Sequence, residues 1–291
     1  MSWPTNSRLL ASTPTRRTDP VLGVAAAQFA PTDDRARNLA EIEGLARLAA
    51  ERGAGLVVLP EYSSWFVPEL GPAWLDHAEP QSGPFVAGLG RIADDLGVHL
   101  VAGMAGVSSE PGKVSNEVVA VAPGAGVVAT YRKLHLYDAF GGRESDWVEA
   151  GDLRDPQLFE VSGFRVGLQT CYDLRFPEVT RWLVDAGAEV VLMPAEWVRG
   201  PLKESHWDTL IKARAIENTV WLAAADHPPK VGVGHSMVVD PMGVQLASVG
   251  EEPRGVALAW LDRERLREVR TTNPSLRLRR FRVEPGPPAT D

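Results

Sequence analysis

The chain of 291 residues contains one cysteine, Cys171, in the stretch "LQTCYDLRFPEV". The apolar run before it is typical of a buried strand and Pro177 can open a helix, so we predict a sharp turn at Cys171. Such a turn exposes a side chain at the carboxyl edge of a sheet, where α/β proteins place their sites. Free N–H groups there are expected to lower the pKa of the thiol and to be available to an oxyanion. The placement favours a nucleophile, although a lone cysteine can also be an inert core residue.

A thiol nucleophile needs a base, and histidine is the usual one. The histidines show no spacing typical of a catalytic partner or a zinc site; they are His77, His99, His135, His206, His227 and His235. A carboxylate is the remaining option, and Glu61 follows the strand-like run "GLVVLP". Lys133 likewise follows the β-rich run "VVATYR". We therefore predict one site built from three residues at strand ends: Glu61, Lys133 and Cys171.

Short apolar runs alternate with helical patterns from residue 21 onward. The predicted strands are Leu22–Phe29, Leu56–Leu59, His99–Val107, Glu117–Val121, Val127–Tyr131, Phe164–Gln169, Val190–Met193 and Val220–Ala225. The predicted helices are Asp33–Arg52, Pro84–Leu96, Pro177–Ala186 and Glu204–Asn218. After residue 225 the pattern changes to strand and turn, with two strands joined at Asp240–Gly243 and another in "RGVALAWLD". This order predicts a layered α/β protein of one domain.

Composition excludes several classes of protein. The formal net charge of −8 argues against a nucleic-acid partner, because phosphate binding needs lysine and arginine clustered on a basic face. The Arg-rich "SLRLRRFRV" is the one local exception, and we interpret it as a charged strand or tail. We predict a disordered tail at residues 1–20 and a frayed tail at residues 284–291. No apolar run is long enough to span a membrane, the N-terminal segment lacks an apolar secretion signal, and a single cysteine suits a reducing compartment, so a cytoplasmic protein is expected.

Three motifs resemble those of the nitrilase superfamily of carbon–nitrogen hydrolases: "VVLPEY", "YRKLHLYD" and "GLQTCYDLRFPE". The likeness continues through "GAEVVLMPAEW", "HWDTLIKARAIENTVWLAAAD" and "GHSMVVDPMG", and so covers residues 21–283. The resemblance implies an α/β fold in the form of a single-domain, four-layer αββα sandwich. It also implies a homodimer or a higher homo-oligomer.

The resemblance further implies a Glu-Lys-Cys triad of Glu61, Lys133 and Cys171. Cys171 would attack an amide carbonyl to form a thioester, and Glu61 would be the general base and acid. Lys133 and the backbone N–H of Tyr172 would stabilise the oxyanion. No cofactor and no metal are expected, because the sequence contains no phosphate loop, dinucleotide fingerprint or metal-ligand cluster.

Many members of the superfamily carry a second active-site glutamate after the lysine motif, which here corresponds to Glu144, with Glu149 as the alternative. By the same resemblance Trp197 lines the pocket; otherwise it is a core aromatic residue. Arg199 and Lys203 would bring positive charge near the site.

Arg175 stands in the nucleophile motif. In the related branch of the superfamily, its counterpart can pair with a substrate carboxylate, for which a guanidinium has suitable geometry. The alternative is a structural ion pair with Asp173 or Glu178. Trp207, Arg214 and Glu217 resemble positions with mainly structural roles.

The nucleophile motif reads Cys-Tyr-Asp rather than the Cys-Trp-Glu of true nitrilases, which favours an amidase. It is most similar to the branch with ω-amidases and deaminated-glutathione amidases. We therefore predict hydrolysis of the C–N bond of a small linear amide that carries a carboxylate, with release of ammonia. Two alternatives stay open: hydrolysis of an N-carbamoyl compound by the same triad, and a redox-sensing thiol protein of a different class.

Overall fold

The computed structural model describes residues 21–284 and 286. The predicted tail at residues 1–20 lies outside the described residues, as does most of the one predicted at 284–291. In the described part, one sheet has the strand order β13 (Gly255–Asp262), β1 (Val21–Gln28), β2 (Leu56–Val58), β3 (His99–Val107), β4 (Val114–Ala122) and β5 (Gly126–Arg132), with β6 (Val148–Glu149) beside β4. The other has the order β12 (Gln245–Ser248), β11 (Met237–Val239), β10 (Trp221–Ala225), β9 (Val190–Pro194), β8 (Phe164–Leu168) and β7 (Phe159–Val161).

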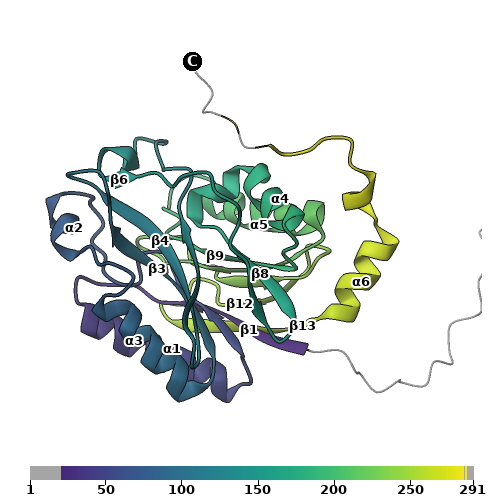
Figure 1. The fold of residues 1–291 in the computed structure, drawn as a ribbon, viewed down its shortest axis with the longest axis horizontal. Helices are drawn as coiled ribbons and strands as arrows, with labels where there is room; N and C mark the ends of the chain where they lie inside the picture. The colour runs from purple at the N-terminus through teal and green to yellow at the C-terminus, as the bar shows by residue number, and fades with distance from the viewer. Residues whose placement is uncertain (1–20, 285, 287–291) are drawn as a thin grey trace, which may run out of the picture.

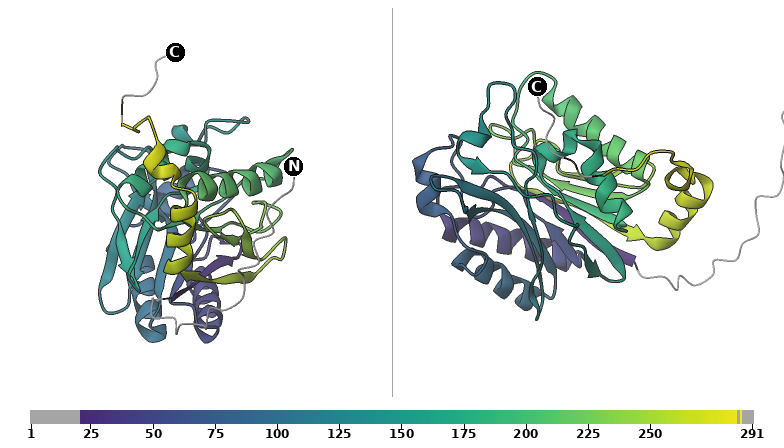
Figure 2. Two further views of the ribbon diagram at one scale, coloured as in Figure 1. Left: turned by 90° about the vertical axis from the view of Figure 1, so that its right-hand side faces the viewer. Right: turned by 45° about the horizontal axis from the view of Figure 1, so that its top comes forward.

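The two sheets pack face to face, and helices cover both outer faces (Figure 1). The inner core contains side chains of both sheets, such as Val58 and Leu192. Helices α1 (Arg35–Glu51) and α3 (Pro84–Leu96) pack on the outside of the first sheet. Helices α4 (Pro177–Asp185) and α5 (Lys203–Asn218) cover the second, as the right-hand view of Figure 2 shows. The expected single-domain four-layer αββα sandwich is confirmed.

The predicted strands and helices correspond to β1 to β5, β8 to β13, α1 and α3 to α5, with ends shifted by a few residues. Two α-helices and two strands of the described part were not predicted: α2 (Pro72–His77), α6 (Arg263–Thr272), β6 and β7. The prediction of strand and turn alone after residue 225 was therefore incomplete. Helix α6 gives a weak sequence signal because only Leu266 and Val269 of its ten residues are buried. None of the helices in the described part is long and apolar enough to cross a membrane.

Strand direction decides which side chains meet. Strand β2 is parallel to β1 and β3, and β9 is parallel to β8 and β10. Glu61, Cys171 and Glu196 follow β2, β8 and β9, so they lie beyond the carboxyl ends of parallel strands, where sites of α/β sheets form. The amide of Glu61 donates to the carbonyl of Ala195 at 3.3 Å, which ties the two sheets together at this edge.

Gly103 of β3 permits the close approach that places Glu61. Its amide donates to the carbonyl of Pro60 at 3.1 Å. A Cβ at this position would lie 2.5 Å from Glu61 Cα and 2.7 Å from Tyr62 N, both backbone atoms. The backbone around Glu61 can therefore pack on β3 only where the strand has no side chain.

His227, two residues beyond the end of β10, supports the same backbone from the opposite sheet. Its ring Nε2 donates to the carbonyl oxygen of Glu61 at 2.8 Å, and its ring packs against the edge of Phe66. Burial lowers the pKa of His227 to about 4, so the ring is neutral at neutral pH.

We predict that Gly103→Ala lowers the free energy of unfolding by about 1–3 kcal/mol, because the added methyl group overlaps backbone that cannot move independently. Urea unfolding of the variant and of the wild type measures this change in the free energy of unfolding. Gly90→Ala in α3 is the matched control, because a Cβ there meets nothing within 4 Å. It should stabilise the protein by about 0.5–1 kcal/mol as an ordinary helix substitution. Equal stability of the two variants would contradict the close approach at Glu61.

We also predict a stability loss in acid that depends on His227. The unfolded ring has its ordinary pKa near 6.5, whereas the folded ring titrates at about 4. As the pH falls, the unfolded state therefore binds the proton first. The stability that comes from keeping His227 neutral in the folded state is complete above pH 6.5 and is lost as the pH falls toward 4. Between pH 7 and pH 4.5 the loss should be about 2–3 kcal/mol. His227→Gln should have a correspondingly smaller pH slope in urea unfolding, and identical slopes would refute the assignment.

Candidate active site

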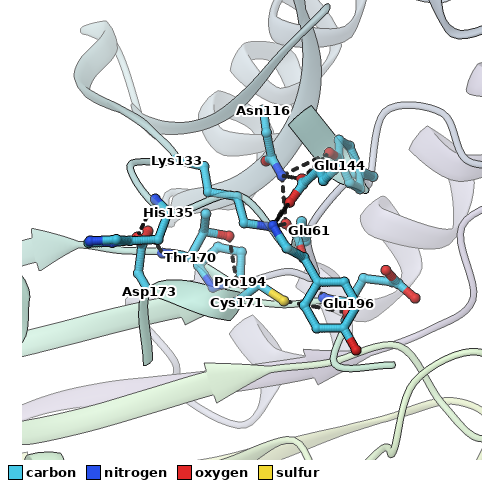
Figure 3. Close-up of polar contacts among 12 residues, drawn as sticks. Glu61, Asn116, Lys133, His135, Glu144, Thr170, Cys171, Asp173, Pro194 and Glu196 are labelled. Atoms are coloured by element: carbon cyan, nitrogen blue, oxygen red, sulfur yellow. Dashed lines mark hydrogen bonds and ion pairs between the residues drawn. The ribbon is translucent and has the colours of Figure 1, made fainter. Parts of the chain in front are cut away.

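Cys171 begins a 3₁₀ helix, Cys171–Arg175, shortly after β8. Its φ of +43° is in the left-handed region, which is strained for a residue with a Cβ and is typical of functional turns. The hydroxyl of Thr170 holds the turn by donating to the carbonyl of Pro194 at 2.7 Å. The thiol donates to the carbonyl of Glu196 at 3.4 Å (Figure 3). The predicted strand-to-helix turn is therefore present at the only cysteine.

The expectation of an exposed, acidic thiol is wrong. Cys171 is only 5 % exposed, at the wall of a cavity, and burial raises the pKa of its thiol well above the usual value. The carboxylate of Glu61 raises it further, and this outweighs the opposing effect of Lys133. The thiol is thus protonated at neutral pH and needs a base. The backbone N–H of Tyr172 has no acceptor within the described residues, so it is available to a ligand in the cavity that Tyr172 also lines.

Lys133, Glu61 and Glu144 form a buried ion cluster beside the thiol (Figure 3). The Lys133 Nζ lies 3.0 Å from Glu61 Oε1 and 2.9 Å from Glu144 Oε2. The other oxygen of Glu61 accepts a bond from the amide of Glu196 at 2.6 Å, and that of Glu144 lies 3.1 Å from Lys133 Nζ. Burial alone would favour neutral Lys133, but the carboxylates of Glu144 and Glu61 raise its pKa well above the usual value. Lys133 is therefore a fixed ammonium.

Two further polar side chains complete the cluster, and neither was predicted from the sequence. Asn116 of β4 donates from Nδ2 to Glu61 Oε1 at 2.6 Å and to Glu144 Oε1 at 3.2 Å. The hydroxyl of Tyr62 donates to Glu144 Oε1 at 3.0 Å. Their signals in the sequence are an asparagine in the short polar segment that precedes an apolar run and a tyrosine next to Glu61.

Of the two candidates for a second active-site glutamate, Glu144 lines the cavity and Glu149 does not. Glu149 lies away from it and accepts bonds from Ser108 and Ser109, which lower its pKa to about 2. Its charge is also paired with Arg132 at 3.3 Å.

Asp173, buried behind Cys171, joins the nucleophile turn to the Lys133 segment. Its Oδ2 accepts from the hydroxyl of Tyr131 at 2.6 Å, and its Oδ1 from the amide of His135 at 3.0 Å. The anticipated alternative of an ion pair between Asp173 and Arg175 is not formed, because these contacts occupy the carboxylate. Arg175 pairs with no carboxylate in the described part of the chain, so the alternative pair with Glu178 is not formed either.

The cavity beside Cys171 has a volume of ≈ 1150 Å³ and is open to solvent. Arg175 and Lys203 line it, and neither has a carboxylate partner among the described residues. The Arg175 guanidinium lies 4.7 Å from the centre of the Trp197 ring, and the Lys203 Nζ lies 5.7 Å from it. Trp197 is thus both a pocket wall and a buried residue, whose indole N–H donates to the carbonyl of Lys203 at 2.9 Å. Arg199 is at the rim, 3.5 Å from Glu204.

The three residues with expected structural roles lie behind this wall. Trp207 is fully buried, and its indole N–H donates to the carbonyl of His235. Arg214 donates twice to the carbonyl of Leu174, at 2.7 and 3.0 Å, which supports the 3₁₀ helix of the nucleophile. Glu217 is paired with Arg214 at 3.1 Å.

The arrangement is suited to acyl chemistry on a neutral carbonyl compound. A protonated thiol lies in the same cavity as a buried carboxylate that can take its proton, and an ammonium lies beside both. Within the described residues, no group of three or more histidine, cysteine, aspartate and glutamate side chains is placed to hold a metal ion.

Comparison with known proteins agrees with this geometry. The model of the family described as carbon-nitrogen hydrolase matches residues 23–271. A deaminated glutathione amidase from Escherichia coli O157:H7 is 41% identical over 264 residues, covering 89% of this chain and 97% of the relative. The solved NitFhit protein of C. elegans has a TM-score of 0.80 and 27% identity, covering 90% of this chain and 66% of that one.

An amidase from Nesterenkonia sp. AN1 has a TM-score of 0.74 and 28% identity, covering 92% of this chain and 97% of that one. The solved structure is of a mutant with covalent addition of the acetamide moiety of fluoroacetamide at its active-site cysteine. The resemblance to the nitrilase superfamily is thereby confirmed. The chain belongs to the carbon–nitrogen hydrolase family, whose members hydrolyse carbon–nitrogen bonds other than peptide bonds.

Proposed function

We propose that the protein hydrolyses a small linear amide bearing a carboxylate, through a thioester on Cys171 and with release of ammonia. The observation that carries this proposal is the cluster of Glu61, Lys133 and Glu144 in the cavity that Cys171 lines. The names of the relatives support amide hydrolysis, and the adduct in the Nesterenkonia amidase supports a cysteine nucleophile.

In the first half of the reaction Cys171 Sγ attacks the amide carbonyl while Glu61 takes the thiol proton. Because burial keeps the thiol protonated, attack and proton transfer are coupled. The resulting oxyanion is stabilised by Lys133 and by the N–H of Tyr172, about 3–4 kcal/mol for each such donor. The C–N bond then breaks, and Glu61 gives its proton to the nitrogen, which leaves as ammonia.

In the second half Glu61 takes a proton from water, and the hydroxide attacks the thioester. The C–S bond breaks, the carboxylic acid leaves, and the proton on Glu61 returns to the thiolate. Glu144 keeps Lys133 charged throughout, because its carboxylate raises the pKa of that ammonium even while Glu61 is protonated.

Arg175 and Lys203 support a carboxylate on the substrate. Two cations in one cavity without an anionic partner repel each other, and a bound carboxylate would neutralise them. The same chemistry accommodates an N-carbamoyl acid, which remains the second candidate. A redox-sensing role is less well supported, because a buried, protonated thiol oxidises slowly. The homodimer and the cytoplasmic location stay predictions.

Cys171→Ala should lower turnover by more than about a thousandfold while leaving the melting temperature nearly unchanged, because the nucleophile is lost without a new contact. The assay measures ammonia from ω-amides, ureido acids and deaminated glutathione, and mass spectrometry of the wild-type enzyme during turnover should find an acyl group on Cys171. Ammonia release by the variant would refute the nucleophile, and release from ureido acids alone would favour the second candidate.

Arg175→Gln should raise the KM for succinamate by about tenfold or more, because the guanidinium that pairs with the carboxylate is lost. Butyramide, which replaces that carboxylate by a methyl group, should be affected less than about twofold. Steady-state kinetics with both substrates measures the difference. Arg199→Gln is the control, since Arg199 is exposed and already paired with Glu204. Equal losses on both substrates would mean that Arg175 is only structural.

A further inference from the structure

Tyr137 contacts both the catalytic ion cluster and the cationic part of the cavity. We propose that Tyr137 is a positioning residue that holds the Lys203 ammonium where a substrate carboxylate binds, and so makes the site selective for anionic amides. The proposal rests on the proposed function. It assigns this selectivity to a hydroxyl group that takes no part in the chemical steps.

The backbone of Tyr137 is fixed to Glu144. Its amide donates to Glu144 Oε2 at 2.6 Å, and its carbonyl accepts from the amide of Glu144 at 3.4 Å. Gly142 allows the intervening loop to close over the tyrosine ring, since a Cβ there would lie 2.8 Å from the ring carbon Cδ1. The ring also meets that of Tyr172 edge-on, with centroids 5.2 Å apart. Tyr137 is therefore placed by the same loop that places the second carboxylate.

Lys203, the first residue of α5, depends on Tyr137 for its position. Its side chain is buried, and its Nζ donates to the Tyr137 hydroxyl at 2.8 Å. This is the one hydrogen bond that Nζ makes to the described residues, and none of their carboxylates lies within ion-pair distance of it. An ammonium has three N–H donors, so two are left for a ligand.

Aromatic rings stabilise the two cations without neutralising them. Phe140 lies 4.2 Å from the Lys203 Nζ and 5.3 Å from the Arg175 guanidinium, measured to the ring centre. Trp197 lies near both groups as well. Cation–π contacts leave the full charge in place, so both cations keep their attraction for an anion. Arg175 also has a buried Nε without an acceptor. The geometry is that of a carboxylate site whose lysine is held by one phenol oxygen.

Tyr62 provides a matched comparison within the same cavity. Its hydroxyl contacts Glu144 and Asn116, not Lys203. Loss of that hydroxyl should therefore affect the chemical step for every substrate. Loss of the Tyr137 hydroxyl should affect only substrates that need Lys203.

The first test compares Tyr137→Phe with Tyr62→Phe on succinamate and butyramide. Tyr137→Phe should raise the KM for succinamate about tenfold, with kcat and all constants for butyramide within about twofold of wild type. Tyr62→Phe should lower kcat on both substrates alike. A similar loss on both substrates in Tyr137→Phe, or no change on succinamate, would overturn the proposal.

A double-mutant cycle tests whether Tyr137 acts through Lys203. If it does, Tyr137→Phe adds nothing further once Lys203→Gln is present, whereas independent roles would give additive losses. Additivity would overturn the proposal.

A binding measurement separates this proposal from the proposed function. In the Cys171→Ala background, calorimetry should give a dissociation constant for succinate about tenfold weaker after Tyr137→Phe. Absence of amide turnover in the wild-type enzyme would defeat the proposed function alone. Unchanged succinate affinity, or no succinate binding at all, would defeat the role of Tyr137.

Discussion

The site depends on one buried interaction, the ammonium of Lys133 between the carboxylates of Glu61 and Glu144. Removing such charges from water is expensive by several kcal/mol per ion, and attraction offsets this only when the remaining donors and acceptors are also bonded. Here Asn116 and Tyr62 supply those bonds. Loss of any one of the three charged side chains would leave a buried charge uncompensated. The strands around the cluster must therefore hold all its members in register at once.

The four-layer fold provides that register. Glu61 comes from the first sheet, and the peptide of Glu196 from the second sheet donates to it. The carbonyl of the same residue accepts a hydrogen bond from the thiol of Cys171, so the backbone of Glu196 holds the nucleophile and the carboxylate at a fixed separation. Because both sheets end their parallel strands at this edge, the packing of one sheet on the other determines the geometry of the reaction centre.

Local signals in the sequence were sufficient for the positions of the longer strands and for the strand ends that carry Glu61, Lys133 and Cys171, but not for the short strands β6 and β7. They could not show what surrounds those residues. The thiol pKa was predicted to fall because free N–H groups were expected at the turn, whereas burial and Glu61 raise it. The environment of Asn116 depends on the pairing of β4 with its neighbours, and no spacing along the chain reveals it. The choice between Glu144 and Glu149 likewise could not be made from the sequence, because it depends on the path of the loop that carries them.

The cavity contains two kinds of cation, and under the proposed function their difference would orient the substrate. Lys133 is neutralised by two carboxylates, so it attracts a stable anion weakly but can still donate to an oxyanion that forms next to it. Lys203 and Arg175 have aromatic rings near their charges and no carboxylate partner among the described residues, so they retain their attraction for a carboxylate. We therefore expect the proposed substrate, with a carboxylate at one end and an amide at the other, to bind with its charged end away from Lys133. In that orientation the amide carbonyl, the end that becomes negative only during the reaction, would lie beside Lys133 and Cys171.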